Sequence, residues 1–589
     1  MRIVRLFPFA CAAFMMSACA SENDDKGGDT NAEGKAQYMA VNIVSVGTNG
    51  SRAAEYENGL EKESQIKDVR FYFYNQDGSP YILDETKTNW TKPRENISNG
   101  QQNTNDENIT LETNSVLVFK SATGNSAPYS VIAVVNAESL GNSQTNPLGE
   151  GTQNLNSLLT TIEGKQFYKV NIPTGSTAPT TNYDKAVSAK NFVMTSSVYL
   201  KDKDGEPQCQ TLVSGHVYNK EDEAKKDPID IYVERVVAKV TAEVNNTTSS
   251  KWKFGDANNW ETTKYGKVVG KTTDGKEVYA VLDGWNVADE NGTAMLEKKI
   301  DKTWTDTGLG FTSSDPWNSA DYHRCFWENS TVAGTAENPS INYSYTTIAN
   351  NAFGTDKYVY TLPNTLKSPT TNEYKYNNKL TKFIVAAHLR YDSDGKGNWK
   401  NVEICNYKGI QYIGQDAVLD VIGSESGYYI EESAGKYKSI GHEQLEFIKA
   451  TTTNAKDYKA MAKVKKGVNP SDVYHKDNTG AYKPLTSLDE VYKKIQAETA
   501  DVRADGRTYY FIPISHLGSD ASIAQYGVVR NHVYKITVND MQGFGTPVVD
   551  KDAVIIPTKP ENEATYLAAK IKVLSWRVVN QNADLDYSK

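Results

Sequence analysis

The chain has 589 residues, 64 Lys and Arg against 73 Asp and Glu, and a formal net charge of −9. This length is enough for two or more domains, while the negative balance without a basic tract argues against nucleic acid or an anionic membrane surface as a partner. The 36 Tyr and 16 Phe residues suit half-exposed β-strands.

The first residues have the pattern of a targeting segment. Arg2 and Arg5 precede an apolar run, residues 6–16, that is too short to span a bilayer. Small residues then lead to Cys19, which resembles the lipobox of bacterial lipoproteins. The resemblance implies that residues 1–18 are a signal peptide and that Cys19 is lipidated, with an ordinary signal peptide cut nearby as the alternative.

A polar tether and a short strand are predicted next. Residues 20–37 are rich in Asp, Glu, Asn, Gly and Lys and contain almost nothing apolar, which is typical of a solvated linker. Within residues 38–46, Met39, Val41 and Ile43 lie on one face of a strand because they alternate with their neighbours.

The rest of the chain is dominated by strand patterns, so we predict an all-β fold built of sandwiches. The clearest strands are Val69–Tyr74, Val116–Phe119, Val131–Val135, Phe192–Met194, Ile231–Val244, Phe383–Leu389, Tyr509–Ile514 and Val528–Val538. Leu488–Glu498 is the best helical segment. A charged run before Pro228 predicts a boundary between an N-terminal domain, residues 53–228, and a C-terminal domain, residues 229–563.

The second domain is larger than one sandwich needs. Residues 245–360 and 391–505 look like polar, Gly- and Asn-rich insertions, which we expect to decorate the surface. Asp-Gly pairs such as those at Asp274, Asp283 and Asp394 predict tight hairpin turns.

Motifs that carry chemistry are missing from the sequence. Residues 266–272 are one residue short of a phosphate loop, and the acidic loop 392–398 lacks the distal Glu of a calcium site and predicts a plain hairpin. The three cysteines after the N-terminal region, Cys209, Cys325 and Cys405, are widely spaced and give neither a disulfide framework nor a metal pattern. We therefore expect no cofactor, no metal and no enzymatic activity.

The last predicted strand, residues 568–579, follows a Pro-rich arm. Its alternation shifts by one residue at Leu574, which predicts a bulge. Its large apolar side chains are Ile571, Val573, Leu574, Trp576 and Val578. Either this strand closes a sheet of its own chain, or it leaves its subunit and completes a sheet in another one.

Several segments together resemble the fimbrillins of Bacteroidia, the type V pilins, and among them the major shaft subunits of minor (short) fimbriae. These segments are the lipobox, residues 38–46 with Ser51-Arg52, Ile231–Val240, Leu362-Pro363-Asn364-Thr365, the strand with Arg530-Asn531 and Tyr534, and the terminal strand with Trp576.

The resemblance implies two transthyretin-like β-sandwich domains and a precursor that is exported and attached to the outer membrane through a lipid. It implies that an Arg-specific protease cuts between Arg52 and Ala53, so that residues 19–52, with their first strand, are removed. The C-terminal segment of a neighbouring subunit, residues 564–589, would then act as a donor strand in a head-to-tail polymer. The implied partners are copies of the same chain, accessory tip and anchor subunits, the protease and surface receptors, in a fimbria that supports adhesion and biofilm formation.

The competing hypothesis is a lipid-anchored glycan-binding protein of the outer membrane, or an accessory or anchor fimbrial protein. Aromatic side chains could form a sugar-binding platform, although local packing within a large insertion is the favoured explanation for them. The residues in question are Trp252, Trp260, Trp285, Trp304, Trp317 and Trp327.

Overall fold

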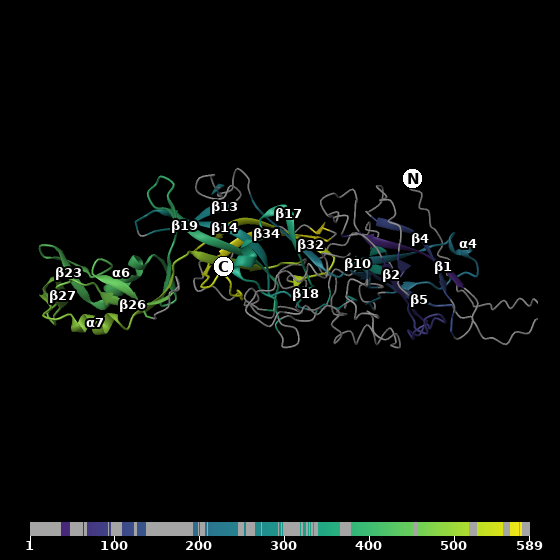
Figure 1. Ribbon diagram of the computed structural model, residues 1–589, viewed down its shortest axis with the longest axis horizontal. Helices are drawn as coiled ribbons and strands as arrows, with labels where there is room; N and C mark the ends of the chain where they lie inside the picture. Colours follow the sequence, from purple (N-terminus) through teal and green to yellow (C-terminus); the bar gives the residue numbers. More distant parts are fainter. Residues whose placement is uncertain are drawn as a thin grey trace, which may run out of the picture.

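The structure is a computed structural model of the whole chain. It describes residues 37–46, 63, 68–91, 94–95, 109–119, 121–122, 127–136, 192–197, 199–200, 207–208, 210–245, 253–254, 265–272, 274–292, 294–295, 297–298, 318–319, 322–324, 328, 330, 334, 340–365, 379–450, 458–516, 527–557, 566–575 and 578–579. The described elements form an elongated molecule with an N-terminal sheet at one end, a sandwich in the middle and a third unit at the far end (Figure 1).

The N-terminal region forms one eight-stranded sheet in the order β3-β2-β5-β6-β10-β1-β4, with β9 paired to β5. Its strands are β1 (Gln37–Val46), β2 (Asp68–Tyr74), β3 (Arg94–Glu95), β4 (Ile109–Phe119), β5 (Ser130–Val135), β6 (Met194–Ser196), β9 (Thr211–Leu212) and β10 (Ile229–Arg235). Every residue of β2 and β5 is buried, so both faces of these strands are covered. A short helix, α4 (Glu221–Ala224), lies near β1.

The middle of the molecule is a sandwich of two sheets. The first has the order β17-β11-β32-β34-β35, with bounds β11 (Ala238–Val244), β17 (Gly354–Thr361), β32 (His532–Gln542), β34 (Tyr566–Ser575) and β35 (Val578–Val579). The second has the order β12-β13-β14-β19-β30-β33, with β20 on β19, and bounds β12 (Lys253–Phe254), β13 (Tyr265–Lys271), β14 (Glu277–Ala288), β19 (Lys382–Asp392), β20 (Trp399–Asn401), β30 (Arg507–Pro513) and β33 (Thr546–Pro547). One hydrophobic core takes side chains from both sheets, and α5 (Tyr345–Ala349) packs on β14 and β19.

Short strands bridge the remaining parts. One small sheet joins β7 (Tyr199–Leu200) and β8 (Pro207–Gln208) to β15 (Asn318–Ser319) and β16 (Tyr322–Arg324), and a two-stranded sheet joins β18 (Asn364–Thr365) to β31 (Gly527–Val528). Together these sheets confirm the predicted all-β class. No helix in the described part of the chain is long and apolar enough to cross a membrane.

The expectation of a polar surface insertion at residues 391–505 is wrong. Most of that range is a folded unit with a hydrophobic core of its own, inserted between β20 and β30 and lying at the end of the molecule opposite the N-terminal sheet (Figure 1). It contains β21 (Ile404–Tyr407), β22 (Ile410–Ile413), α6 (Gln415–Ser426), β23 (Tyr428–Ser433), β24 (Lys436–Ser439), β25 (Leu445–Lys449), β26 (Tyr458–Val464), η4 (Pro470–Asp472), β27 (Val473–Lys476), β28 (Tyr482–Pro484), α7 (Asp489–Ile495) and β29 (Thr499–Arg503). We call it the inserted unit; the predicted helix at Leu488–Glu498 is its α7.

The other expected insertion, residues 245–360, also supplies strands to the sandwich, because it contains β13, β14 and most of β17. The turn predicted at Asp283-Gly284 is wrong for the same reason: Gly284 lies inside β14, at a bulge opposite β19. A Cβ atom at Gly284 would lie 2.5 Å from the Ile348 carbonyl oxygen of α5, so only glycine allows the helix to approach this closely. The hairpin predicted at residues 392–398 does form, between β19 and β20.

The strand predicted as Ile231–Val244 is divided between two sheets. Its first part is β10, which pairs with β1 and β6 in the N-terminal sheet, and its second part is β11, which pairs with β17 and β32 in the sandwich. The chain therefore passes from one body to the other at Val236 and Val237, one strand later than the predicted boundary at Pro228.

Candidate functional site

The predicted removable strand, β1, lies in the interior of the N-terminal sheet rather than at its edge. It runs parallel to β10 on one side and antiparallel to β4 on the other. Met39 is completely buried, and Val41 and Ile43 are opposite Ile229 and Ile231 of β10. Removal of β1 would therefore leave two strands with unpaired backbone groups around a slot.

The predicted donor strand, β34, lies near the edge of a sheet of its own chain. It pairs antiparallel with β32 along its whole length, so that Ile571 is opposite Ile536 and Val573 is opposite Tyr534. Among the described residues, its other side pairs with the two-residue strand β35 alone. In the single chain the strand thus takes the first of the two predicted positions, closing its own sheet.

The bulge predicted at Leu574 is replaced by a reversal of the chain. Leu574 is opposite Val578 in an antiparallel pair, so Val578 belongs to a second strand that folds back on the first. The shift in apolar alternation that the sequence shows is the result of this hairpin. Trp576 lies outside the described residues.

The first and last strands match in length and in pattern. Each has ten residues. In β1 the apolar positions are Met39, Val41 and Ile43, and in β34 Ile571 and Val573 alternate with Lys570 and Lys572. Both are thus strands with one apolar face, the kind that covers the core of a half-buried sheet.

The segment with Arg530, Asn531 and Tyr534 lies where the chain passes between the two bodies. Arg530 is buried, and its Nε donates to Glu328 at 2.8 Å. Asn531 has a left-handed backbone, with φ of 57°, and its N–H donates to the carbonyl oxygen of Val237 at 2.8 Å. Tyr534 is buried at the start of β32 and accepts a hydrogen bond from a backbone N–H, and burial raises the pKa of its hydroxyl. The motif therefore fastens β32 to the junction between β10 and β11.

A buried charge cluster ties a residue that follows the predicted cleavage site to the same junction. The Arg235 guanidinium donates to the Glu63 carbonyl oxygen at 2.7 Å, and the Glu63 carboxylate contacts Lys239 Nζ at 3.0 Å and accepts from the Tyr360 hydroxyl. Glu63 is completely buried. Burial lowers the pKa of Arg235 to about 10, and the neighbouring Glu63 opposes this shift.

Sequence reasoning missed this cluster and its neighbour. Lys298 pairs with Glu234 at 2.9 Å, and both side chains are buried. Glu297 lies in the same region, and burial raises the pKa of its carboxyl well above the ordinary value, against the opposing charge of Arg530. Glu63 and Glu297 lie outside the predicted strands, and Glu234 lies inside the strand predicted at Ile231–Val244, whose alternation does not reveal a buried ionic partner.

Several predicted sites lie outside the described residues: the lipidation site Cys19, the cleavage site Arg52 and Ala53, and the cysteines Cys209 and Cys325. Cys405 is a free, buried thiol in the inserted unit, and burial raises its pKa, which makes it unreactive. In the described part of the chain no group of three or more metal-ligating side chains is present.

The structure corrects one member of the proposed Trp platform. Trp285 is completely buried in the sandwich, where its ring packs 5.7 Å from Phe383 and its Nε1 donates to the Ala352 carbonyl oxygen at 2.9 Å. It is a core residue. The other five Trp residues of the proposed platform lie outside the described residues.

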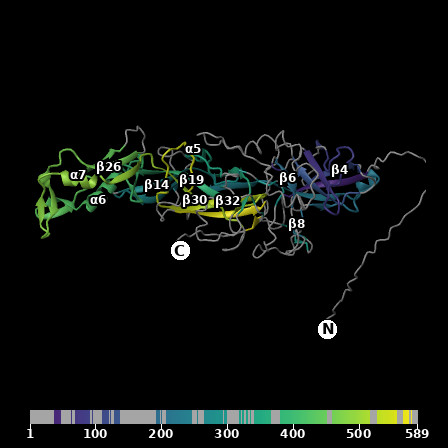
Figure 2. The ribbon, with the colours of Figure 1, turned by 90° about the horizontal axis from the view of Figure 1, so that it is seen from below.

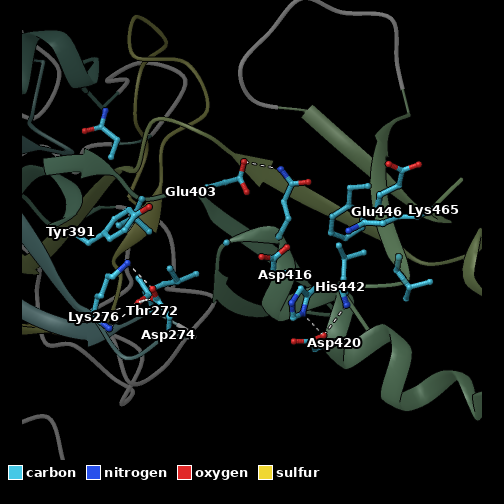
Figure 3. A pocket seen from close by; sticks show the side chains of 18 residues that line it. Thr272, Asp274, Lys276, Tyr391, Glu403, Asp416, Asp420, His442, Glu446 and Lys465 are labelled. Carbon is cyan, nitrogen blue, oxygen red and sulfur yellow. Dashed lines mark hydrogen bonds and ion pairs between the residues drawn. The ribbon is translucent and has the colours of Figure 1, made fainter. Parts of the chain in front are cut away.

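An open cleft of about 950 Å³ separates the sandwich from the inserted unit (Figure 3). On the sandwich wall Lys276 pairs with Asp274 at 2.7 Å. On the opposite wall His442 contacts Asp420 at 2.8 Å, and Gln415 donates to Glu403 at 2.9 Å. Each of these pairs lies within one wall, so the cleft marks the junction of two bodies and none of these pairs bridges it.

With this geometry in place, comparison with known proteins gives one family. Residues 504–582 match the model described as "Major fimbrial subunit protein type IV, Fimbrillin, C-terminal". This stretch holds both the Arg530-Asn531 motif and β34. The C-terminal region of this chain is that of a fimbrillin. The predicted resemblance to the family is thereby confirmed, through the segment that carries its most specific motifs.

The chain is also similar to several solved structures. A proposed cell adhesion protein from Parabacteroides distasonis has 11% identity and a TM-score of 0.33, and the match covers 94% of this chain and 100% of that one. A fimbrial assembly protein from the same species has 11% identity and a TM-score of 0.24 over 62% and 86% of the two chains. The tip fimbrial protein Mfa3 from Porphyromonas gingivalis has 10% identity and a TM-score of 0.29 over 92% and 100%. No curated protein matches the chain.

These TM-scores are too low to show a shared fold. The family assignment therefore rests on the C-terminal match, and the fold is known from the sheets described above. The matched family consists of fimbrial subunits, which supports a fimbrial subunit rather than an enzyme. The matched stretch ends just after β35, so both strands of the C-terminal hairpin belong to it.

Proposed function

We propose that this fimbrillin is a shaft subunit that polymerises by exchange of its first strand for the last strand of a neighbour. In this proposal the precursor is attached to the outer membrane through a lipid on Cys19, and an Arg-specific protease cuts after Arg52. The polymer then supports adhesion and biofilm formation. The observation that carries the proposal is the interior position of β1, which lies between β10 and β4 although it precedes both in the chain.

The position of β1 makes it both separable and protective. Only residues 47–52 lie between its end and the proposed cut, so cleavage would leave it held by non-covalent contacts alone. While it stays in place it satisfies the backbone groups of both neighbours and covers the core with Met39. A precursor that keeps β1 therefore has no open slot and should not polymerise.

The energetic preference of β34 supports an exchange. At its present place it has one full ladder, with β32, whereas in the slot it would have ladders on both sides. Each additional hydrogen bond contributes about 0.5–1.5 kcal/mol net, and each large apolar side chain that becomes fully buried contributes about 1.5–3 kcal/mol. The entropy lost when the arm before β34 becomes ordered opposes these gains.

The ends of the two strands favour a head-to-tail chain. The first residue of β34, Tyr566, is the root of the strand and is opposite Gln542. Three residues after Gln542, the carbonyl oxygen of Gly545 accepts a hydrogen bond from Gln411 of the inserted unit, so the root lies near that unit. The slot lies at the other end of the molecule, in the N-terminal sheet (Figures 1 and 2). A strand that swings out about its root would point away from its own N-terminal sheet, toward a following subunit, which gives an open heterologous polymer.

The buried Glu63 cluster supports this sequence of events. Glu63 lies after Arg52 in the chain and remains in the protein after the proposed cut. Because Arg235 and Lys239 hold it at the junction, the segment that follows the cut stays attached to the body while β1 leaves.

Filaments sheared from the cell surface test the proposal when electron microscopy is combined with N-terminal sequencing of the assembled protein. We expect filaments in which the chain begins at Ala53 and lacks β1. Cys19→Ala should abolish lipid labelling and surface delivery of the precursor. A surface protein that begins at Cys19 and forms no filaments would instead indicate an anchor or a lipid-anchored binding protein.

A further inference from the structure

An extended segment before β34 exposes an unusual amount of apolar surface. Residues 548–557, here called the strap, run along the sandwich from Arg507 at the start of β30 to Tyr343 just before α5. Three large aliphatic side chains on it are about half exposed: Val549 (51%), Val554 (46%) and Ile556 (58%). The described residues contain six exposed large hydrophobic side chains in all, so half of them lie on this one segment.

The strap is held in place by its backbone and by its inward residues. The N–H of Val548 donates to the Arg507 carbonyl oxygen at 3.0 Å, and the N–H of Ile555 donates to the Tyr343 carbonyl oxygen at 2.9 Å. Val548 and Ile555 are buried in the sandwich core. The exposed side chains therefore project from a firmly attached segment whose fold does not depend on them.

The position of the strap in the chain points to its partner. The strap ends at Pro557, and β34 begins at Tyr566. The strap is therefore the described segment that precedes the root of the proposed donor strand. Whatever subunit receives β34 must approach this root closely. An exposed apolar surface at such a place matches the composition of an interface core better than that of a solvated surface.

The N-terminal sheet, at one end of the molecule, offers an apolar counterpart. Leu212 is 41% exposed and lies on β9, opposite Ser130 of β5. The other end of β5 is held at the junction, because Val135 pairs with Met194 and Met194 with Arg235. Leu212 thus lies at the end of the N-terminal sheet that is remote from the sandwich, on the side where β1 begins.

We propose that the strap is a docking surface for a second copy of this chain and contacts the remote end of its N-terminal sheet around Leu212. This inference rests on the proposed head-to-tail polymer and adds a rigid contact beside the flexible donor strand. The contact is heterologous, because the strap lies on the sandwich and Leu212 lies on the N-terminal sheet, so two different surfaces meet and the contact can repeat along a filament. It would align the arriving subunit before β34 enters the slot and would stiffen the joint afterward.

The test uses the full-length chain in cells that make it. The variant Val549→Glu/Val554→Glu/Ile556→Glu places three charges on the strap at positions that already face solvent. The matched control, Ile410→Glu/Ile448→Glu, charges the exposed aliphatic side chains of the inserted unit. We expect the strap variant to lower the mass of surface filaments per cell at least tenfold and the control to leave it unchanged, with equal amounts of exported, cleaved protein in both.

A photo-cross-linking amino acid placed at Ile556 identifies the partner directly. We expect a cross-link to the region around Leu212 of a second copy. A separate cysteine pair, one on β34 and one on β4, reports strand exchange between subunits independently of the strap. Suppose that this cysteine pair forms between subunits. If the strap variant then assembles normally, or if Ile556 cross-links only within its own chain or to a different protein, the strap inference is overturned and strand exchange stands. If that pair never forms between subunits, the proposed function itself fails.

Discussion

The first and last strands of this chain are similar in length and apolar pattern but occupy different positions in their sheets. β1 is an interior strand with a full ladder to β4 and a second ladder to β10, whereas β34 has one full ladder and a nearly free side. An interior strand is held by two neighbours, and a strand near an edge is held by one. In the proposed exchange, β1 would have to lose its covalent link and two ladders before it could leave, while β34 would have to unpair only from β32.

The largest effect should come from locking β1 into its sheet. Val41 and Ser115 are Cα partners in the antiparallel ladder of β1 and β4, a geometry within the range of a disulfide. Val41→Cys/Ser115→Cys, oxidised in the precursor, should abolish filaments even after the cut at Arg52, and a reductant should restore them. Electron microscopy and a non-reducing gel provide the measurement.

A matched lock in the inserted unit controls for oxidation itself. Glu446 and Lys463 are Cα partners in β25 and β26, far from either exchanging strand. Glu446→Cys/Lys463→Cys should oxidise and polymerise normally. Normal filaments from the oxidised β1 lock would show that the slot is not the polymerisation site.

The next effect concerns removal of the last strand. Deletion of residues 566–589 should abolish polymerisation and should also lower the melting temperature of the monomer, because β32 loses its ladder with β34. The loss should be on the order of several kcal/mol, a large share of the stability of a domain. Calorimetry and filament counts measure the two losses separately.

The position of β34 in its own sheet changes what this deletion can decide. From the sequence alone, the stability of the monomer could be independent of its last strand. Because β34 pairs with β32, we expect a lower melting temperature whether β34 is a donor strand or only closes its own sheet. A truncated chain that still forms filaments would contradict the donor role. Its melting temperature alone would not.

A smaller effect is expected at the junction that both strands depend on. Glu63→Gln should reduce the free energy of unfolding by about 3–5 kcal/mol, because Lys239 would lose its buried ion pair and Arg235 would lose the neighbouring negative charge. Denaturant unfolding measures this loss. Glu221→Gln, which removes an exposed partner of Lys225, is the control and should change little. Equal stabilities in the two variants would show that the cluster does not hold the junction.

The smallest effect is a pH dependence at Glu297. Its folded-state pKa is raised by burial, so the stability that this group contributes is present at low pH and is lost as the pH rises through the folded value. Glu297→Gln removes this loss, and the variant should melt a few degrees higher than the parent near pH 8 and equally near pH 4. Thermal melts at the two pH values measure it; a constant difference at both would contradict the assignment.

The sequence predicted local patterns well and spatial partners poorly. The strands at Val69–Tyr74 and Val131–Val135 were clear because they are short runs of β-branched and aromatic residues, and the helix at Leu488–Glu498 was clear because its apolar residues recur at helical spacing. The division of Ile231–Val244 between two sheets was hidden, since the apolar pattern continues through Val236 and Val237 without interruption. What divides the strand is pairing with distant segments, which periodicity does not show.

The inserted unit was missed because its signals are short and interrupted. α6 carries apolar residues at Val418, Leu419 and Ile422, but Gly423 follows at once and resembles a helix breaker. In the structure a Cβ atom at Gly423 would lie 1.8 Å from the Ile440 carbonyl oxygen, so glycine permits close packing there instead of ending the helix. Likewise, the hairpin after Ser575 looked like a bulge because both features shift the alternation by one residue.

The central claim is that β34 changes partners when subunits assemble, and cysteine cross-linking in filaments tests it most directly. Lys570 and Thr537 are Cα partners within one chain, so Lys570→Cys/Thr537→Cys reports the monomer position of β34. Lys570→Cys combined with a cysteine at each position of β4 in turn reports the slot. In filaments we predict that the first pair stays reduced and that one of the second pairs links successive subunits into a ladder on a non-reducing gel. Complete oxidation of the first pair within single chains, with no ladder from any of the second pairs, would contradict the account.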